Sequence, residues 1–191
     1  MRTFWFALIF SSASPQARAQ APPAPKDTVA TRYQLPGADC ALFPAAARLP
    51  DWLPAKKTAS RDRFTPSVNQ AATTEKALAA VQLLTVNPGA KTHQDSAYAR
   101  IITQQLSHYR RQYFGFYNRH KQPCLFINFL SDYPFTPEEA GLRPKPPGYV
   151  PYWLQRYVFI GDGADDQWSI YYNLATGKLY QYWHNLDLGG G

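Results

Sequence analysis

The strand-like second half of the chain limits most strongly what the protein can fold into. Between residues 112 and 184, short apolar stretches alternate with polar turns such as 118–121 and 175–178. Short connections of this kind join neighbouring antiparallel strands. The pattern predicts five strands, at residues 112–117, 124–130, 156–160, 168–174 and 179–184. Three of the four connections are short, so we expect an antiparallel meander.

Two helical stretches precede these strands. Thr65 and Pro66 suit an N-cap and a first helical position, and an apolar stripe follows until residues 87–89 (Asn-Pro-Gly). A second stripe, with apolar residues three and four apart, predicts a helix from about residue 95 to Arg111. The segment 33–64 has no clear period, and we expect it to be an irregular arm lying across the domain.

The order of helices followed by strands predicts a single α+β domain over residues 33–191. It would have two main helices packed on a five-stranded antiparallel meander sheet. Apolar residues make up 45% of the chain, which is enough to bury a core of that size. This layout resembles the cystatin-like fold. The inhibitory Q-x-V-x-G hairpin of cystatins is absent from the sequence, so protease inhibition is not implied.

The first 19 residues have the layout of a secretory signal peptide. Arg2 supplies positive charge, residues 4–10 are apolar, and Ala17 and Ala19 are the small residues expected before a cleavage site. The apolar run is far shorter than the roughly 20 residues that span a bilayer. A buried N-terminal strand is the alternative. We expect an exported protein, periplasmic or extracellular, with a Pro/Ala-rich linker at 20–32 and no transmembrane segment in the mature chain.

Cys40 and Cys124 are the two cysteines of the chain. In an exported protein an even pair of cysteines is most simply a disulfide. The bridge would close a long loop and stabilise the fold by about 4 kcal/mol. We therefore expect a Cys40–Cys124 disulfide that ties the arm to the sheet. A catalytic cysteine is the alternative, and no neighbouring motif supports it.

The charge balance indicates the kind of partner. Cleavage would remove Arg2 and Arg18 and lower the formal net charge from +7 to +5. This mild excess suits weak attraction to anionic surfaces or glycans, and it falls short of the dense basic face of a nucleic-acid binder. Arg110 and Arg111 lie among aromatic residues, as in a base-stacking platform, but export argues against that use. We expect no nucleic-acid partner.

The motifs of common enzymes are missing. The sequence has no G-x-S-x-G, H-E-x-x-H, P-loop, G-x-G-x-x-G or C-x-x-C. Its four histidines lie far apart, so we expect no metal and no cofactor. Asp162, Asp165 and Asp166 could offer oxygen ligands to calcium, although a polar turn explains them as well. A pair of acids for glycoside hydrolysis could come from Asp132, Glu138, Glu139 and Asp162, but no spacing brings two of them together.

The connection 131–155 is unusually long and carries six prolines. Long loops in compact domains are usually functional or disordered, and residues 136–141 look like one capped helical turn inside this one. We expect an ordered loop whose aromatic residues, together with the outer face of the last strand, bind an unknown protein or glycan. The predicted binding residues are Tyr133, Phe135, Tyr149, Tyr152, Trp153, Tyr182 and His184. Alternatively, these aromatics fill a second layer of the sheet.

Four short motifs carry a resemblance to known sequences. They are Y-R-R-Q-Y-F-G at 109–115, I-N-F at 127–129, D-G at 162–163 and Y-N-L at 172–174. Over about residues 65–185 the chain resembles a group of short exported bacterial proteins of unknown function. In that group the region after the second strand is shorter, and a glycine follows the asparagine of the last strand, where this chain has Leu186 after Asn185. The resemblance implies an architecture and no mechanism.

These observations predict a non-enzymatic binding module of the cell envelope or the extracellular space. One alternative is a hydrolase acting on an envelope polymer with acids around Asp132 and Asp162. The other is a structural subunit of an envelope assembly, which a large flat apolar patch would favour.

Overall fold

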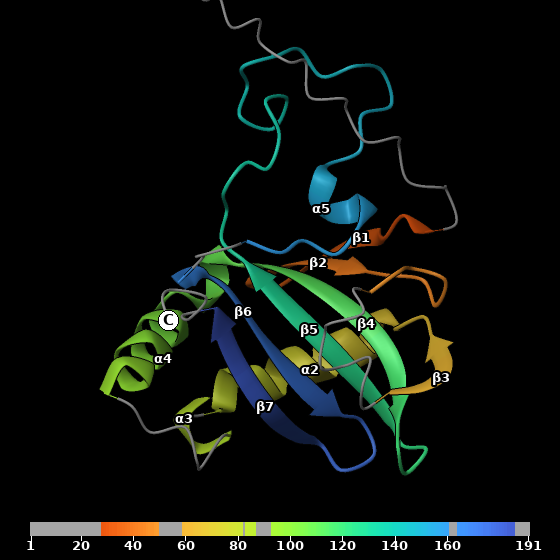
Figure 1. The fold of residues 1–191 in the computed structure, drawn as a ribbon, viewed down its shortest axis with the longest axis vertical. Helices are drawn as coiled ribbons and strands as arrows, with labels where there is room; N and C mark the ends of the chain where they lie inside the picture. Colours follow the sequence, from red (N-terminus) through yellow and green to blue (C-terminus); the bar gives the residue numbers. More distant parts are fainter. Residues whose placement is uncertain (1–27, 50–58, 82, 87–92, 161–163, 186–191) are drawn as a thin grey trace, which may run out of the picture.

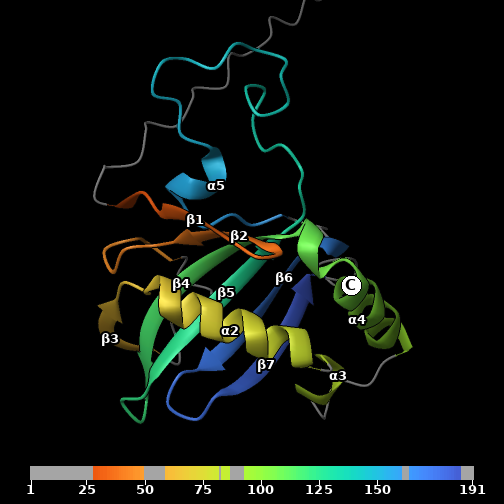
Figure 2. The same cartoon turned by 180° about the vertical axis from the view of Figure 1, so that it is seen from behind.

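A computed structural model describes residues 28–49, 59–81, 83–86, 93–160 and 164–185. Within them the protein is built on a mixed sheet of seven strands (Figure 1). Helices cover one face of this sheet, which we call the helix face (Figure 2). The other, the loop face, is covered by the end of the long loop and by the chain that follows it.

The order of strands in the sheet is β1-β2-β4-β5-β6-β7, and β3 also pairs with β4. Strand β2 is parallel to the first half of β4, whereas β3 is antiparallel to its second half. All other neighbours are antiparallel. The strands are β1 (Thr31–Leu35), β2 (Ala38–Leu42), β3 (Ala59–Phe64), β4 (Arg110–Asn118), β5 (Pro123–Leu130), β6 (Ala164–Asn173) and β7 (Lys178–Asn185).

The predicted fold class, with two main helices on a five-stranded antiparallel sheet, is wrong. The segment 33–64 is not an irregular arm, because it holds β2, β3 and most of β1. Strand β2 is buried on both faces and β1 is exposed on both, so neither shows the alternation that reveals a half-buried strand. Pro36 and Gly37, which only punctuate the sequence, form the two-residue turn of the β1–β2 hairpin, with Gly37 at φ +72°.

The helices are shorter than predicted. They are α2 (Val68–Ala80), α3 (Leu83–Val86), α4 (His93–Gln104), the 3-10 turn η2 (Leu106–His108) and α5 (Tyr152–Gln155). Ser67, not Thr65, caps α2: its hydroxyl accepts from the N–H of Gln70, and the Gln70 side chain bonds back to the N–H of Ser67. The second predicted helix stops before Arg110 and Arg111, which belong to β4.

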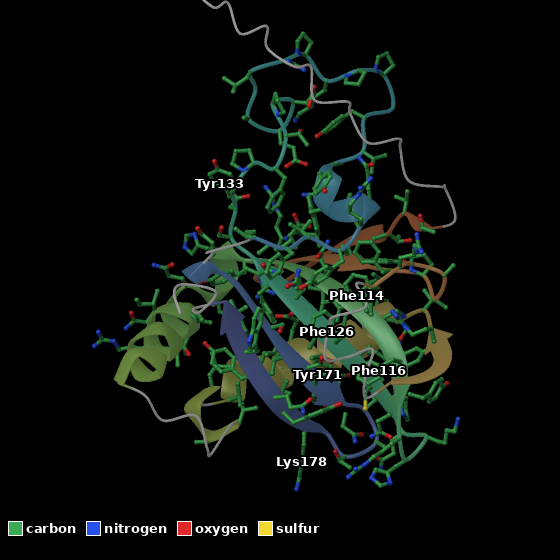
Figure 3. The ribbon with its side chains drawn as sticks, viewed as in Figure 1. Phe114, Phe116, Phe126, Tyr133, Tyr171 and Lys178 are labelled. Atoms are coloured by element: carbon green, nitrogen blue, oxygen red, sulfur yellow. The ribbon has the colours of Figure 1, made fainter. Side chains whose placement is uncertain are left out.

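Four of the five predicted strands coincide with β4, β5, β6 and β7, and only Leu174 of the predicted residues falls outside them. The predicted strand at 156–160 is wrong, because this segment has no strand neighbours. The central strands alternate between the two faces as expected. Tyr113 points to the helix face, and Phe114 and Phe116 point to the loop face together with Phe126 and Tyr171 (Figure 3).

The two cysteines are free and lie on opposite faces of the sheet. Cys40 pairs with Arg111 across β2–β4, and Cys124 pairs with Phe116 across β4–β5. These two positions of β4 are five residues apart, which is about 16 Å along a strand, whereas a disulfide needs Cα atoms within about 7 Å. The predicted Cys40–Cys124 disulfide is therefore not formed, because the sheet itself lies between the thiols.

Some predictions fall outside the described residues. The signal peptide at 1–19 and the Asp162-Gly163 turn are among them. The linker predicted for 20–32 reaches into β1 at Thr31. Among the described helices, none has both the length and the apolar character that crossing a bilayer would need.

Candidate functional site

The loop 131–155 projects beyond the end of the sheet (Figure 1). It leaves β5 after Leu130, where the N–H of Ser131 donates to the carbonyl of Asp166 at 2.8 Å. It returns to the loop face through α5. Every residue of the loop is among those described, and its outgoing and returning legs are held by a small set of side chains.

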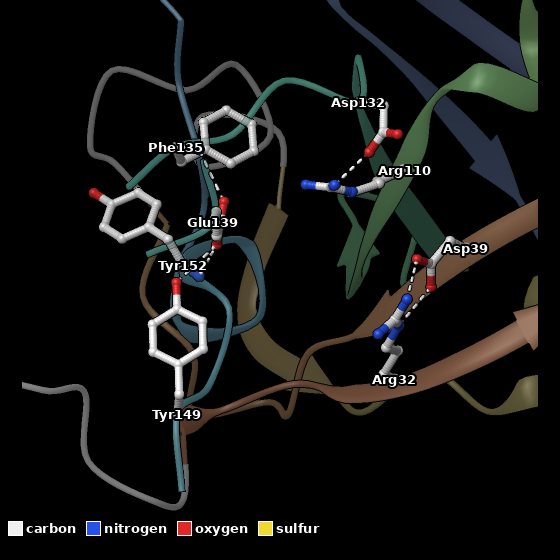
Figure 4. A network of polar contacts seen from close by, with 8 residues as sticks. All are labelled: Arg32, Asp39, Arg110, Asp132, Phe135, Glu139, Tyr149 and Tyr152. Carbon is white, nitrogen blue, oxygen red and sulfur yellow. Dashed lines mark hydrogen bonds and ion pairs between the residues drawn. The ribbon is translucent and has the colours of Figure 1, made fainter. Parts of the chain in front are cut away.

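The carboxylate of Glu139 joins the two legs of the loop (Figure 4). It accepts from the backbone N–H of Phe135 at 2.8 Å and from that of Tyr152 at 2.6 Å. The hydroxyl of Tyr149 donates to the same carboxylate at 3.4 Å and contacts the hydroxyl of Thr136 at 2.9 Å. Backbone donors to a carboxylate make strong bonds, so Glu139 fixes the base of the projection.

The predicted capped turn at 136–141 is present. The N–H of Ala140 donates to the carbonyl of Thr136 at 3.0 Å, and the hydroxyl of Thr136 accepts from the N–H of Glu139 at 3.2 Å. Gly141 closes the turn at φ +72°, a conformation that glycine adopts without strain. Burial raises the pKa of Tyr149, opposed by its Thr136 hydrogen bond and reinforced by Glu139, so this phenol stays protonated as a donor.

Three buried side-chain amides hold the returning leg against the sheet. We call Gln112, Asn128 and Gln167 the amide ladder; they come from β4, β5 and β6 and are fully buried on the loop face. Gln112 donates to the carbonyls of Trp153 at 2.6 Å and Arg156 at 2.7 Å. Its oxygen accepts from Asn128 at 2.9 Å and from the N–H of Val158 at 3.0 Å.

The other two amides complete the same pattern. Asn128 and Gln167 each donate to the carbonyl of Val158 at 2.9 Å, and Gln167 also donates to Asn128 at 2.9 Å. The oxygen of Gln167 accepts from the N–H of Ile160 at 2.6 Å. Residues 156–160 therefore satisfy their backbone groups with side chains of the sheet instead of a neighbouring strand. This explains why an apolar, strand-like stretch is not a strand.

Trp153 is buried beneath two arginines. Its side chain is 2% exposed, and the guanidinium carbons of Arg32 and Arg110 lie 5.8 and 5.6 Å from its ring centroid. Asp39 holds Arg32 through two bonds of 2.9 and 2.7 Å, and Asp132 pairs with Arg110 (Figure 4). Trp153 thus fixes α5 to strands β1 and β4, and it is a structural residue, not part of an open binding surface.

The structure places the predicted binding residues in different environments. Phe135, Tyr149 and Tyr152 are half-buried and gather around Glu139, whereas Tyr133 is 64% exposed. Tyr182 is buried on the helix face against Trp168, with ring centroids 5.8 Å apart. The side chain of His184 lies outside the described residues. A single surface made of all seven predicted residues is therefore wrong, because the bulge in β7 turns Tyr182 into the opposite core.

Residues 140–148, which we call the loop tip, are all exposed. Leu142 is 80% exposed, and the basic Arg143 and Lys145 alternate with prolines beyond it. Leu142, Arg143 and Lys145 were not among the predicted binding residues, because that prediction rested on aromatic side chains. The signal that could have found them is the run of three prolines among two cations, which keeps a segment extended and solvated.

The described acids of the predicted hydrolase do not converge. The side chain of Asp132 is 74% exposed and paired with Arg110, and Glu139 is engaged by the loop backbone. Among the described residues, no group of three His, Cys, Asp or Glu side chains could hold a metal ion.

The helix face has a cavity of about 450 Å³ beside α2, with Glu75 and Arg111 in its lining. Arg111 is 1% exposed; it donates twice to Glu75, each at 3.3 Å, and once to the carbonyl of Tyr109. The hydroxyl of Tyr113 also donates to Glu75. Burial, reinforced by Glu75, raises the pKa of Cys40 to about 12. We call Glu75, Arg111 and Tyr113 the ion cluster; its groups satisfy one another and tie α2 to the sheet.

No protein-family model matches the chain, and comparisons with curated proteins and with solved structures found no significant match.

Proposed function

We propose that the protein is a binding module and that the loop tip, together with the exposed Tyr133 on the leg that leaves β5, is its contact surface. The observation that carries this proposal is an ordered projection with an exposed end. Glu139 and the amide ladder hold both legs of the loop, yet the leucine at its tip is 80% exposed. Long ordered loops of this kind are typical of recognition elements.

The physical benefit of such a loop lies in the free energy of binding. Fixing the backbone of one residue costs about 1–2 kcal/mol, and a flexible binding loop bears this cost when its partner binds. Here the anchors at the base and the prolines at the tip fix much of the loop in advance. A preorganised tip binds with a smaller entropic cost.

The chemistry of the tip favours a protein partner. Glycan sites usually stack aromatic rings on sugars, but the aromatic residues of this loop other than Tyr133 are buried or half-buried around Glu139 and the arginines. The tip instead offers Leu142, Arg143, Lys145 and prolines. We infer a partner with an apolar pocket for Leu142 and acidic groups nearby. The signal-peptide layout of residues 1–19 supports a partner in the cell envelope or outside the cell.

The test is capture of a partner by variants of the full chain. A photo-crosslinking residue at position 140 is used to label partners in envelope extract and in culture medium. Leu142→Ser, Arg143→Ser and Lys145→Ser together should lower the yield of a specific adduct at least about tenfold, which is a loss of about 1.4 kcal/mol. The tip supports no other part of the fold, so the thermal midpoint should not change.

A matched control separates recognition from general charge attraction. Lys76→Ser with Arg100→Ser removes the same two charges from exposed positions on α2 and α4. This control should capture the partner as well as the wild type does. Equal adduct yield from the tip variant and the wild type would refute the proposal.

A further inference from the structure

A second cavity lies at the end of the sheet opposite the loop, beside the β4–β5 and β6–β7 turns. Its volume is about 660 Å³, and Lys178, at the start of β7, marks its place in Figure 3. We call it the turn-end cavity. Arg119, His120 and Lys178 line it, and none of the described lining residues is Asp or Glu. The cavity is therefore a positively charged recess.

The amide groups of the turn-end cavity have their oxygens already occupied. The oxygen of Gln122 accepts from Asn118 at 3.1 Å and from Asn173 at 2.9 Å, which joins the two turns. The oxygen of Asn118 accepts from the backbone N–H of His120 and Gln122, at 2.9 and 3.0 Å. That of Asn173 accepts from the N–H groups of residues 175 and 176.

Because these bonds occupy the amide oxygens, the groups that remain to bind a ligand are mostly hydrogen-bond donors. The amide nitrogen of Gln122, the guanidinium of Arg119 and the ammonium of Lys178 all donate hydrogen bonds, and the two cations cannot accept them. His120 accepts from Arg119 at 3.1 Å through Nε2, so in its neutral form it carries its proton on Nδ1. A set of donors with two positive charges fits a carboxylate or phosphate group.

The backbone around the turn-end cavity is strained. Among the described residues, the non-glycine residues with positive φ are Lys121, at 60°, and Gln181, at 51°. Lys121 lies in the β4–β5 turn, and Gln181 lines the cavity. Such conformations cost free energy and concentrate where function requires them. Lys121 owes its conformation to the hairpin turn, whereas Gln181 lies within β7 and beside the cavity.

The positive φ of Gln181 occurs at an irregularity in the pairing of β6 with β7. Across β6–β7, Ser169 pairs with Trp183 and Tyr171 pairs with Tyr180, so one residue of β6 lies opposite two of β7. This β-bulge breaks the alternation of β7. Tyr182 can then enter the helix-face core while Gln181 remains exposed beside the cavity.

Tyr180 gives the turn-end cavity a flat wall. Its ring is half-buried and stacks on Tyr171, with centroids 5.3 Å apart. Burial raises the pKa of Tyr180, and its hydrogen bond to Cys124 raises it further, so the phenol remains neutral. A neutral aromatic side chain beside cationic donors suits a sugar that carries an acidic group.

We propose that the turn-end cavity binds an anionic saccharide, with Arg119 and Lys178 on its acidic group and Tyr180 beside its ring. This proposal is independent of the loop tip, which lies at the other end of the sheet. The anionic group can be a carboxylate or a phosphate, and the probes below distinguish the two.

The experiment measures binding of defined probes to the full chain by calorimetry at low salt. The probes are a galacturonic acid trimer, glucose 6-phosphate, neutral maltotriose and inorganic phosphate. We expect one of the two acidic sugars to bind at least about tenfold more tightly than maltotriose and than inorganic phosphate. The acidic sugar that binds more tightly shows whether the cavity prefers a carboxylate or a phosphate. Equal binding of maltotriose, equal binding of inorganic phosphate alone, or no binding of either acidic sugar would overturn the proposal.

Variants locate the binding site. The double variant Arg119→Gln with Lys178→Gln should weaken binding of the acidic sugar at least about tenfold, since each charged contact contributes more to affinity than a neutral one. The matched control, Arg143→Gln with Lys145→Gln at the loop tip, removes the same charge and should bind like the wild type. All four side chains are exposed, so these variants should fold. Equal weakening by both pairs would show only general charge attraction and would overturn the proposal.

Gln181→Gly separates a binding role from a structural one. Glycine adopts positive φ without strain, so this variant should be at least as stable as the wild type. It should still bind the acidic sugar severalfold more weakly, because the side chain beside the cavity is lost. Unchanged affinity for the acidic sugar, or a loss of stability, would contradict a role of the bulge in binding.

Discussion

The two faces of the sheet bury polar clusters of different kinds. On the helix face, the ion cluster joins Glu75 of α2 to Arg111 and Tyr113 of β4. On the loop face, the amide ladder joins three strands to the backbone of residues 153–160. The charged groups bond mainly to one another. Each amide donates to a backbone carbonyl, and Gln112 and Gln167 also accept from backbone N–H groups.

This difference shows what each cluster can hold. A carboxylate and a guanidinium form one strong connection, which suits a helix whose own backbone bonds are already made. A segment without secondary structure needs partners for its N–H and C=O groups, and neutral amides supply both. The loop is therefore held without burying a charge beneath it. We expect the following changes to test this distinction, from the largest effect to the smallest.

Arg111→Met should have the largest effect. It leaves the carboxylate of Glu75 partly buried without its cation, and breaking a buried ion pair in this way costs about 3–5 kcal/mol. Urea unfolding followed by tryptophan fluorescence measures the loss. The double variant Glu75→Met with Arg111→Met removes both charges and should recover a large part of it. A double variant less stable than Arg111→Met would contradict the account of the ion cluster.

Gln112→Ala should cost somewhat less, about 3 kcal/mol. It removes four hydrogen bonds and leaves buried backbone groups of residues 153–158 unsatisfied, each at about 1–3 kcal/mol, partly offset by local relaxation. The same unfolding experiment applies. Gln105→Ala, at an exposed position of the same residue type, is the control and should change stability by less than about 0.5 kcal/mol. Equal effects of the two substitutions would show that the ladder holds nothing.

The buried thiols should make the stability of the fold decrease at alkaline pH. Cys40, on the helix face, should contribute more to this decrease than Cys124, on the loop face. Burial raises the pKa of Cys40 from 9.0 to about 12, and burial also raises that of Cys124. Below pH 9 both states of the chain keep these protons. Above it the unfolded chain loses them first and binds fewer protons than the native one, so stability falls as pH rises toward 12.

Comparing two single variants shows how much each thiol contributes to the fall in unfolding free energy with pH. Between pH 9 and 10, Cys40→Ala should flatten the fall in unfolding free energy more than Cys124→Ala does, since both variants keep the same tyrosines. Urea unfolding at pH 8, 9 and 10 measures it, with slopes compared instead of absolute stabilities because both variants also leave cavities. The reverse order would contradict the stronger raising of the pKa of Cys40.

Glu139→Gln should have the smallest effect on global stability and a clear local one. The substitution keeps the shape but removes the charge that strengthens the bonds from Phe135 and Tyr152. Amide hydrogen exchange at these two residues should accelerate about tenfold, while unfolding free energy changes by less than about 1 kcal/mol. Glu138→Gln is the matched neighbour and should leave both amides unchanged. Equal acceleration in the two variants would remove Glu139 from the account.

Local patterns in the sequence predict the centre of the sheet well. Strands β4 to β7 are runs of apolar residues separated by clear turns, and the turn at 136–141 has a cap and a glycine. Patterns fail for β1 and β2, which have only five residues each and contain polar residues such as Arg32 and Asp39. Strand β2 is buried on both faces and β1 on neither, so both look irregular in the sequence.

The candidate site was harder to predict because its partners are remote in sequence. Trp153 looks like an exposed aromatic of a long loop, and only Arg32 and Arg110 from β1 and β4 explain its burial. Residues 156–160 have the apolar character of a strand, but their partners are side chains of Gln112, Asn128 and Gln167. Hydrophobic periodicity reports which side of a segment is buried and not which groups bond to it.

Hydrogen exchange of the wild-type chain tests the central claim, that buried side-chain amides anchor an ordered loop and leave its tip free. The amide of Val158 should exchange as slowly as those of β5. The amides of Phe135 and Tyr152 should exchange at intermediate rates, and that of Lys145 at the tip fastest. That gradient from sheet to tip is what the account predicts. Exchange of Val158 at the rate of an unprotected peptide would contradict it, because the amide ladder would then hold nothing in place.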